Sequence, residues 1–550
     1  MAALVTLLIG HRGAGKTTLL ERLSARARTV DLDAEIARRQ GLTDLFAQGE
    51  ARFREWEKET LESLVASANE RTFIAVGAGC EGPLPERAHV VWIRRATDSQ
   101  GRSFLDRPRL DADELPLAEF FARHPERERR YRAWAHEELI LPEGYEGGLE
   151  GFFEPRADFR PAGELTLLAE NFKDLESFTA RRDWVRRFEI RDDLLNAAQI
   201  QEALLGVAEE RRLYSCRTAT SRPQGLSDWA LELGPPMAPV AIESRHGPNL
   251  EFHSSRAIQK SAQEVNDFEE LLKGHRWWME DPRRRAFLPR SKDGRWRWYR
   301  SLFGPRMPIH FVREGDGSSP DQPYFWQTQL QPPLAANFAA VVGFPVEHTR
   351  TPLAQLEFFK RLGMPVVAIP IAAGELRSAL PILQALGLTH AAVTSPLKEE
   401  AFALATRLSG EARIRKSVNT LQLKNREWHG HNTDAPALKD LRREIGAPDR
   451  VWLWGGGGIK SGVLAEWPGA TAISARQGTA DETPPDLLIW AAPRAREFVF
   501  PRAIPKKILD LNYGDDSPGL EFAALHKVEY VSGLRLFKLQ AAYQREYWSG

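Results

Sequence analysis

The sequence predicts a multidomain α/β protein built from three successive parts. Short apolar runs alternate with amphipathic helical segments near both ends of the chain, and each end carries a glycine-rich loop directly after an apolar run. Between these ends, residues 161–333 carry eight short strand candidates, which favour a (β/α)8 barrel. We therefore expect domains at residues 1–145, 161–333 and 337–550, with linkers at Leu141–Pro155 and Gln329–Pro333.

Size and composition limit what these domains do. At a typical ~150 residues per domain, 550 residues make three or four domains. The 75 acidic and 75 basic side chains cancel, so the chain lacks the excess positive charge of proteins that bind nucleic acid or a membrane surface. Two cysteines are too few for a disulfide framework, and no apolar run reaches the ~18 residues of a membrane span. Without a signal-peptide pattern, we expect a cytoplasmic protein. Its oligomeric state stays open.

The first glycine-rich loop has the form of a P-loop. It follows the predicted strand Leu4–Ile9 and precedes the helix-prone segment Thr18–Arg26. Glycines let backbone N–H groups curl around phosphate, the lysine reaches the terminal phosphates, and the threonine ligates Mg²⁺. The residues predicted to bind ATP and its Mg²⁺ in this way are Gly10, Gly13, Gly15, Lys16, Thr17 and Thr18.

Residues 1–145 resemble shikimate kinase, through motifs that occur in the order of that family. These motifs are Asp31-Leu32-Asp33, Phe53-Arg54-Glu55-Trp56-Glu57, Gly77-Ala78-Gly79, Arg107-Pro108-Arg109-Leu110 and Arg127-x3-Tyr131. The resemblance implies a P-loop kinase fold that phosphorylates shikimate. Further strands of its sheet are predicted at Thr29–Leu32, Phe73–Val76 and His89–Ile93.

The same resemblance implies a role for each motif. Asp31 joins the Mg²⁺ shell, and Asp33 binds and activates the substrate hydroxyl. The substrate carboxylate is held by two arginines, with a glutamate and two glycines around it: Arg54, Arg127, Glu57, Gly77 and Gly79. Arg107 closes over the phosphates. One departure stands out, because Ala78 replaces the middle glycine of the family's triplet and predicts reduced turnover.

Residues 337–550 resemble shikimate dehydrogenase. The motifs are His348-Thr349-Arg350-Thr351-Pro352, Val393-Thr394-Ser395-Pro396-Leu397-Lys398, Asn419-Thr420-Leu421, Gly430-His431-Asn432-Thr433-Asp434 and Gln540-Ala541-Ala542. This resemblance implies a two-lobed enzyme that reduces 3-dehydroshikimate. Lys398 and Asp434 are then the catalytic pair, because hydride arrival at a carbonyl builds an alkoxide that needs a proton. The acid and its hydroxyls are assigned to Thr349, Thr351, Thr394, Asn419, Tyr513 and Gln540.

The second glycine-rich loop predicts a Rossmann-type cofactor lobe, at residues 435–520. Gly455, Gly456, Gly457 and Gly458 follow the apolar run Val451–Trp454. Arg476 lies where the family carries an arginine, which favours NADP(H) over NAD through the 2′-phosphate. Only nine residues separate Arg476 from the next predicted strand, Asp486–Trp490, so the lobe is predicted to be shortened.

The middle region resembles a type I 3-dehydroquinate dehydratase, and the three parts follow the order of the C-terminal part of the pentafunctional AROM polypeptide. Glu189-x-Arg191 and Cys216-Arg217-Thr218 match family motifs, and His253 is the candidate general base. That reaction needs a lysine on the sixth strand, which we predict at Arg276–Met279, where there is none. The middle is therefore predicted to be a degenerate barrel.

Together these resemblances predict a bifunctional enzyme of aromatic amino acid biosynthesis. One end would reduce 3-dehydroshikimate with NADPH, and the other would phosphorylate the resulting shikimate with ATP and Mg²⁺. Two alternatives remain open: a trifunctional enzyme with an active barrel, and a non-catalytic scaffold that binds metabolites. Whether quinate is also a substrate is left open.

Overall fold

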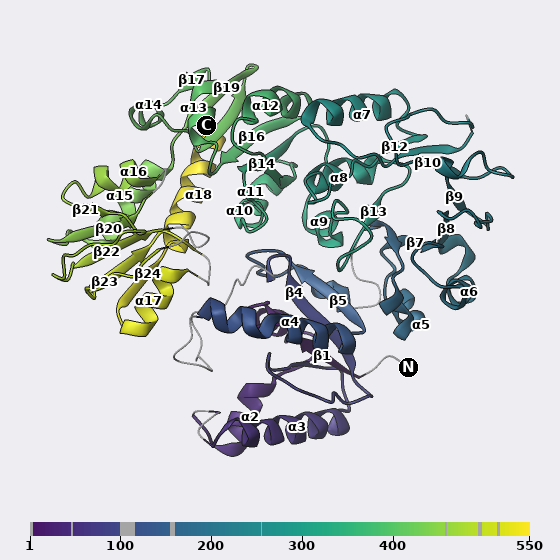
Figure 1. Ribbon diagram of the computed structural model, residues 1–550, viewed down its shortest axis with the longest axis horizontal. Helices are drawn as coiled ribbons and strands as arrows, with labels where there is room; N and C mark the ends of the chain where they lie inside the picture. The colour runs from purple at the N-terminus through teal and green to yellow at the C-terminus, as the bar shows by residue number, and fades with distance from the viewer. Residues whose placement is uncertain are drawn as a thin grey trace. The chain divides into compact units, whose positions relative to one another are not determined.

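A computed structural model describes residues 4–43, 45, 48–98, 116–153, 160–254, 256–456, 459–492, 498–513 and 517–550 (Figure 1). The chain forms two compact units. The first contains residues 1–95, 127–336 and 362–365, so the N-terminal and middle parts belong together; the second contains residues 96–126, 337–361 and 366–550. Within the described residues, no helix is both long enough and apolar enough to span a bilayer.

The N-terminal sheet is parallel and five-stranded, in the order β2-β3-β1-β4-β5. Its strands are β1 (Val5–Ile9), β2 (Arg28–Asp31), β3 (Thr72–Ala75), β4 (His89–Arg95) and β5 (Glu137–Leu141). The helices around it are α1 (Lys16–Leu23), α2 (Leu32–Gln40), α3 (Glu50–Ser67) and α4 (Pro116–Trp134). The first four strands confirm the prediction to within two residues; β1, β3 and β4 are short buried runs, whereas β2 is largely polar.

The predicted linker at residues 141–155 is partly wrong. β5 was not predicted, and a 3-10 helix at Glu150–Phe153 buries Phe152 and Phe153. The Phe153 ring meets Phe73 of the N-terminal sheet edge to face, and Phe152 packs against Phe325 of the middle region. The glycines and prolines that suggested a flexible connection therefore surround a packed hydrophobic contact.

The middle part is an eight-stranded parallel sheet, in the order β12-β11-β10-β9-β8-β7-β6-β13. Its strands are β6 (Gly163–Thr166), β7 (Val185–Arg191), β8 (Arg212–Cys216), β9 (Ser227–Ala230), β10 (Ile242–Arg245), β11 (Ile258–Ser261), β12 (Arg285–Phe287) and β13 (Phe311–Val312). Strands in chain order with the last returning to the first are typical of a (β/α)8 barrel. No ladder joins β12 to β13, both of which are fully described, so a closed barrel is not confirmed.

Three of the eight predicted strands of this region, Leu250–His253, Arg276–Met279 and Tyr324–Gln327, are wrong. Residues 276–279 belong to helix α7 (Phe268–Glu280), which Asp267 caps by accepting a hydrogen bond from the Glu270 N–H. Residues 250–253 form a loop, and residues 325–327 begin helix α9 (Phe325–Leu330). Tryptophan-rich runs indicated strands but form the apolar face of helices. The sixth strand is β11, which does contain a lysine, Lys260.

A buried charge network joins the N-terminal and middle parts of the first unit. Glu137 of β5 pairs with Arg182 at 2.7 Å, with His89 at 2.6 Å, and with Arg181. Arg182 also forms two 2.7 Å hydrogen bonds to Glu314, which follows β13. Arg182 is 1% exposed, so the pairing is not screened by water. The two parts therefore share one buried contact rather than a flexible connection.

The second unit has two sheets. The first has the order β15-β14-β16-β18-β19-β17 and contains β14 (Phe338–Gly343), β15 (Val366–Pro370), β16 (Leu388–Val393), β17 (Arg407–Leu408), β18 (Thr420–Lys424) and β19 (Glu427–His431). Helices α10 (Thr351–Ala354), α11 (Leu356–Arg361), α12 (Leu376–Ala385), α13 (Lys398–Leu404) and α14 (Gly410–Arg415) accompany it. The apolar runs Ala339–Phe344, Pro365–Ile369 and His390–Thr394, which predict strands from the sequence, coincide with β14, β15 and β16 to within two residues.

The second sheet of this unit is parallel, in the order β21-β20-β22-β23-β24. Its elements are α15 (Asp434–Ile445), β20 (Val451–Gly455), α16 (Lys460–Glu466), β21 (Thr471–Ile473), β22 (Leu487–Ala491), β23 (Lys507–Asp510), α17 (Pro518–His526), β24 (Glu529–Ser532) and α18 (Leu534–Ser549). Residues 474–486 hold no helix, which confirms the shortening. Helix α18 returns to the first sheet, where Trp548 donates a hydrogen bond to the Leu421 carbonyl (Figure 1).

Replacing Arg182 with methionine is expected to destabilise the first unit by about 3–5 kcal/mol, because it leaves buried carboxylates without their cation. Urea unfolding followed by circular dichroism measures this. The exposed Arg38→Met variant, which loses only its surface pair with Glu35, is the control and should lose less than about 1 kcal/mol. Equal losses in the two variants would contradict a stabilising network.

The same network predicts a pH dependence. Despite the opposing effect of burial, the Arg182 guanidinium and neighbouring cations hold the pKa of Glu137 well below its usual range. A lowered pKa stabilises the fold above the unfolded-state pKa, and this stabilisation is lost as the pH falls toward the folded-state pKa. The difference in stability between wild type and Arg182→Met should therefore narrow in acid.

Candidate functional site

The P-loop is built by glycines in backbone conformations that other residues avoid. Gly10, Gly13 and Gly15 have φ angles of 144°, 70° and 102°. A Cβ on Gly10 would lie 2.0 Å from the Ile93 carbonyl oxygen, so no larger residue fits. Helix α1 begins at Lys16, whose Nζ donates to the Gly10 carbonyl at 2.6 Å. The loop is thus curled with its lysine at its mouth, as a phosphate cradle requires.

Two oxygen groups beside this loop fit a magnesium ion. The Thr17 hydroxyl lies 3.5 Å from Asp31 Oδ2, and Asp31 also caps helix α2 by accepting a hydrogen bond from the Ala34 N–H. Mg²⁺ takes one or two protein oxygens and completes its octahedron with phosphate and water. Thr18, the remaining predicted nucleotide residue, follows Thr17 in α1.

The carboxyl ends of β2 and β3 bring the predicted acid-binding residues together. Arg54 Nη1 donates to Glu57 at 2.9 Å, and Cβ atoms added to Gly77 and Gly79 would lie 2.9 Å from Asp33 Oδ1 and 2.4 Å from Arg54 Nη2. Burial raises the pKa of Asp33, with Asp31 adding to the effect. The five residues therefore lie beside one another, with the Asp33 carboxylate and the Arg54 guanidinium close to the same glycine turn.

The remaining predicted residues of this domain are only partly placed. Tyr131 of α4 donates a hydrogen bond to the Ala78 carbonyl at 2.5 Å, which ties this helix to the glycine turn. Arg127 lies one turn before Tyr131 on the same helix. Arg107 lies outside the described residues.

The second unit assembles the predicted catalytic pair. Lys398, the first residue of α13, places its Nζ 2.6 Å from Asp434 Oδ2. Asp434 is the first residue of α15, and the Asn432 side chain accepts hydrogen bonds from the Asp434 and Ala435 N–H groups at the start of this helix. The other carboxylate oxygen accepts hydrogen bonds from Asn419 at 2.6 Å and Gln540 at 2.5 Å. Three side chains from distant parts of the sequence thus converge on the Asp434 carboxylate.

The three threonines predicted to bind the substrate acid lie after β14 and β16, two paired strands of the first sheet of this unit. Thr349 donates to the Thr351 hydroxyl at 3.1 Å, just after β14. Thr394 follows β16, and a Cβ on Gly343 would come within 2.4 Å of its methyl group. β14 and β16 are paired, so these residues share one edge. Tyr513 lies in the other lobe, where its ring packs on Phe537 with centroids 5.0 Å apart.

The cofactor loop is only partly described. Gly455 and Gly456 have φ angles of 87° and 147°, and a Cβ on Gly455 would lie 2.9 Å from the Ala492 backbone. Gly457 and Gly458 lie outside the described residues. Arg476 is exposed and follows β21, the neighbour of β20, so it stands at the same sheet edge as the glycines. This arrangement fits a pyrophosphate at the glycine turn and a phosphate near Arg476.

A charged cluster inside the middle sheet was missed by the sequence prediction. Lys260 on β11 is 3% exposed and pairs with Asp228 on β9, which also pairs with Arg217 after β8. Despite burial, Arg217 and Lys260 hold the pKa of Asp228 well below its usual range, while burial lowers the pKa of Lys260.

The histidine predicted as general base in this region does not lie at the end of a strand. His253 is exposed in a loop, whereas His246 directly follows β10. Burial, with the nearby cations Lys260 and Arg217, lowers the pKa of His246 to about 4. The sequence predicts a strand at Val240–Glu243, two residues before β10, and so does not place Ser244-Arg245-His246 at a strand end.

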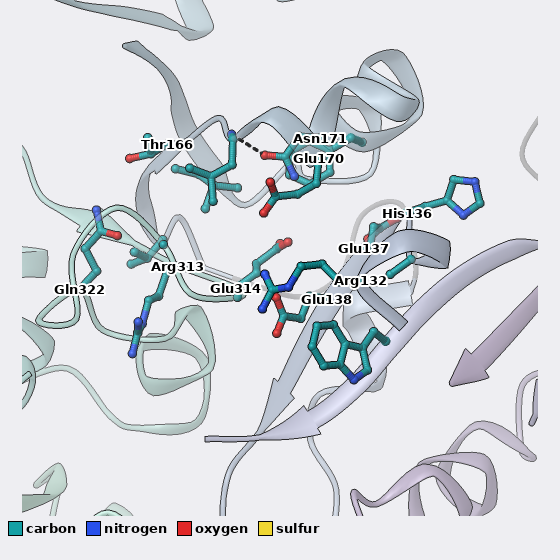
Figure 2. A pocket seen from close by; sticks show the side chains of 18 residues that line it. Arg132, His136, Glu137, Glu138, Thr166, Glu170, Asn171, Arg313, Glu314 and Gln322 are labelled. Atoms are coloured by element: carbon teal, nitrogen blue, oxygen red, sulfur yellow. Dashed lines mark hydrogen bonds between the residues drawn. The ribbon is translucent and has the colours of Figure 1, made fainter. Parts of the chain in front are cut away.

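A pocket of about 60 Å³ lies between β5 and the middle sheet (Figure 2). Arg132, Glu138 and Glu170 are directed into it (Figure 2). Burial raises the pKa of Glu138 to about 7, although Arg94 opposes this at 2.9 Å. Asp316 pairs with Arg94 and Arg132 at 3.1 Å each. The charged side chains in and around this pocket largely pair with one another, which is typical of a contact between domains.

Comparisons with known proteins match both ends of the chain. The family model for shikimate kinase matches residues 12–136, and that for the shikimate dehydrogenase substrate binding domain matches residues 341–421. A shikimate dehydrogenase (NADP(+)) of Xanthomonas campestris is 42% identical over 130 residues, which are 22% of this chain and 46% of that protein. The chain thus spans about half the length of this relative.

A second relative is matched nearly throughout. Shikimate dehydrogenase (NADP(+)) of Xylella fastidiosa is 30% identical over 255 residues, covering 38% of this chain and 90% of that protein. Among solved structures, the Thermus thermophilus enzyme in complex with NADP(H) and shikimate is 23% identical, with a TM-score of 0.32 over 39% of this chain and 94% of that one. The Aquifex aeolicus enzyme is 20% identical, with a TM-score of 0.33 over 39% and 93%.

The two family-model matches coincide with the sheet that carries the P-loop and with the sheet beside which Lys398 lies. The N-terminal sheet carries a shikimate kinase domain. Through its C-terminal region, this chain belongs to the shikimate dehydrogenase family.

Proposed function

We propose that the chain reduces 3-dehydroshikimate to shikimate with NADPH and phosphorylates shikimate with ATP. The observation that supports this best is the Lys398–Asp434 pair at 2.6 Å, with Asn419 and Gln540 on the free carboxylate oxygen. This pair stands beside hydroxyl groups suited to a polyol acid. The first unit carries a separate arginine–glutamate pair beside a P-loop.

In the dehydrogenase site, Lys398 would hold the proton that the carbonyl oxygen needs. Hydride arrives from NADPH at the carbonyl carbon, so negative charge develops on the oxygen. An ammonium held by Asp434 is fixed in one rotamer and can donate at that oxygen. Asn419 and Gln540 hold the carboxylate in place, so the lysine stays oriented during the transfer.

The cofactor preference follows from the edge of β20 and β21. Gly455 and Gly456 would receive the pyrophosphate of NADP(H), and Arg476 would pair with its 2′-phosphate. The absence of a helix in residues 474–486 leaves Arg476 exposed. NADPH is therefore expected to bind through fewer contacts than a full-length lobe offers.

In the kinase site, Asp33 would accept the proton of the attacking hydroxyl. Its raised pKa makes it a stronger base than an exposed aspartate. Arg54, oriented by Glu57, would pair with the substrate carboxylate, joined by Arg127 from α4. Lys16 and the P-loop amides would stabilise charge on the transferred phosphoryl group, with Mg²⁺ beside Thr17 and Asp31.

Lys260 supports a second candidate function, an active middle region. The predicted absence of a lysine rested on a strand that is a helix, so that argument no longer holds. A buried amine with a lowered pKa is the nucleophile that adds to a ketone and expels water to form an imine. Asp228 pairs with Lys260, and burial together with the nearby Lys260 charge lowers the pKa of His246, so both groups are candidates for moving protons during imine formation. This supports a Schiff-base dehydratase, and hence a trifunctional chain.

Substituting the two catalytic lysines should separate the two proposed activities. Lys398→Met is expected to lower the kcat of dehydroshikimate reduction by about 10²–10⁴-fold, because the proton donor is lost, and to spare phosphorylation. Lys16→Met should do the reverse. NADPH absorbance and shikimate 3-phosphate formation measure the two steps, with the exposed Lys439→Met as control. Wild-type shikimate binding without turnover in either assay would instead support a scaffold.

Borohydride treatment with 3-dehydroquinate tests the second candidate function. Reduction of an imine should attach the ligand to the peptide that contains Lys260, as detected by mass spectrometry. Lys260→Met should abolish this labelling, and Lys273→Met, at an exposed position on α7, should retain it. An unlabelled wild-type peptide under turnover conditions would rule out the imine.

Gly79→Ala tests the carboxylate pocket of the kinase. The added methyl group would lie 2.4 Å from Arg54 Nη2, so the guanidinium must move away from Glu57. We expect the KM for shikimate to rise by about tenfold, the cost of about 1.4 kcal/mol of lost pairing, with little change in folding stability. Calorimetric titration with shikimate, in a chain whose dehydrogenase site is disabled, measures the binding directly. An unchanged affinity would remove Arg54 from the site.

A further inference from the structure

Helix α18 packs on both sheets of the second unit and carries three hydrogen-bonding side chains on one face. Gln540, Gln544 and Trp548 recur every four residues, so they lie above one another along the helix. The first half of the helix packs on the second sheet, where Leu536 belongs to the buried core. The last turn packs on the first sheet, where Trp548 donates to the Leu421 carbonyl at 3.1 Å. The residues between these two contacts reach the proposed dehydrogenase site.

Gln544 holds this helix against the backbone of Asn419. Its Nε2 donates to the Asn419 carbonyl at 3.3 Å, while the Asn419 side chain donates to Asp434 Oδ1 at 2.6 Å. One turn earlier on α18, Gln540 Nε2 donates to the same Asp434 oxygen at 2.5 Å. Gln544 therefore joins the two segments whose amides hold the Asp434 carboxylate.

Gln355 adds a third segment to this contact. It directly follows α10, and its backbone N–H donates to the Thr351 carbonyl at 3.0 Å. Gln355 Nε2 donates to Gln544 Oε1 at 3.1 Å and to the Ala541 carbonyl at 3.3 Å. Its Oε1 accepts a hydrogen bond from Arg545 at 3.1 Å. The two glutamines thus connect the segments around residues 351, 419 and 540, all of which are predicted to bind the substrate.

The two glutamines are buried, and a buried amide costs stability unless it is hydrogen-bonded. Gln355 is 0% exposed and Gln544 is 8% exposed, and each uses both its amide nitrogen and its amide oxygen in hydrogen bonds. Apolar side chains of similar volume would fill the same space between helix and sheet. Because a fully paired polar network specifies one arrangement of the packed elements, the glutamines fix where α18 lies against Asn419.

We propose that Gln355 and Gln544 are positioning residues of the dehydrogenase, an inference that rests on the proposed reduction of 3-dehydroshikimate. They act through Asn419 and α18, whose amides stay on one oxygen of Asp434 while its other oxygen stays 2.6 Å from Lys398 Nζ. The ammonium is then aimed at the carbonyl oxygen when hydride arrives. A displacement of about 1 Å at such a group can cost about 10²-fold in rate.

Steady-state kinetics of NADPH oxidation by the full chain test this assignment. Gln544→Met should lower kcat by about 10- to 100-fold and raise the KM for 3-dehydroshikimate, whereas the KM for NADPH should not change. Because the chemical step is slowed, the isotope effect on kcat with NADPH deuterated at the transferred position should rise. Gln355→Met should act in the same direction. The double variant should lose no more than the larger single loss, because both substitutions remove one contact.

Gln422→Met is the matched control for a buried glutamine at the same helix. Gln422 is 7% exposed, and its Nε2 bonds to the Trp548 carbonyl at 3.1 Å and lies 3.3 Å from His390 Nε2, so it anchors the end of α18. This variant should lose a similar amount of stability in urea unfolding and keep the wild-type kcat and isotope effect. If Gln544→Met and Gln355→Met, compared at folded concentrations, match Gln422→Met in kcat and isotope effect, the positioning role is overturned.

Shikimate binding separates a failure of this inference from a failure of the proposed function. A wild-type chain that oxidises no NADPH with 3-dehydroshikimate would remove the proposed reduction. Calorimetric titration with shikimate is then the readout, in chains that also carry Arg54→Met to disable the kinase site. Affinity at least about threefold weaker in Gln544→Met than in Gln422→Met would retain the positioning role for a binding site, because Asn419 and Gln540 are displaced. Equal affinities would overturn it.

Discussion

The parallel pairing of strands is the constraint on which the sites of this chain depend. Parallel strands end at a common edge, so residues far apart in sequence meet there without long loops. Gly10 follows β1 and Asp31 ends β2 in one sheet; Gly455 ends β20 and Arg476 follows β21 in another. His246 follows β10 in the third sheet under the same rule. The positions of the two glycine-rich phosphate loops therefore follow from strand order, whereas the Lys398–Asp434 pair lies at a sheet in which β18 runs antiparallel to β16 and β19.

The expected reactivity at these sheet edges depends on charged side chains that the protein shields from water or holds in one orientation. Asp33 becomes a stronger base because it is buried, and Lys398 is held in one direction because Asp434 and its amide partners are rigid. Arg182 is also a buried charge, but its role is structural. It pairs with Glu137 in the N-terminal part and with Glu314 in the middle part of the same unit.

The sequence predicted the ends of the molecule better than its middle. Apolar runs such as Val5–Ile9 and Val451–Gly455 mark buried strands, and glycines after them mark turns that only glycine fits. β11 could not be found in this way, because its buried Lys260 breaks the apolar pattern. The tryptophans at residues 277–278 indicated a strand, although a capped helix face buries Trp278 equally well. A strand that contains a buried polar residue is thus hard to recognise from its sequence pattern.

The buried charges of the middle region bear on whether this region is only a spacer between the two ends of the chain. Its contact with the N-terminal sheet, through Phe152, Phe325 and Arg182, is reason enough to retain the fold. It is no reason to retain Lys260 against Asp228, because a buried ion pair is often no more stable than apolar residues of the same volume. Buried groups with perturbed pKa values in a sheet of this order are concentrated at functional sites. A structural role is enough to explain the sheet, whereas a catalytic role explains the buried charges inside it better.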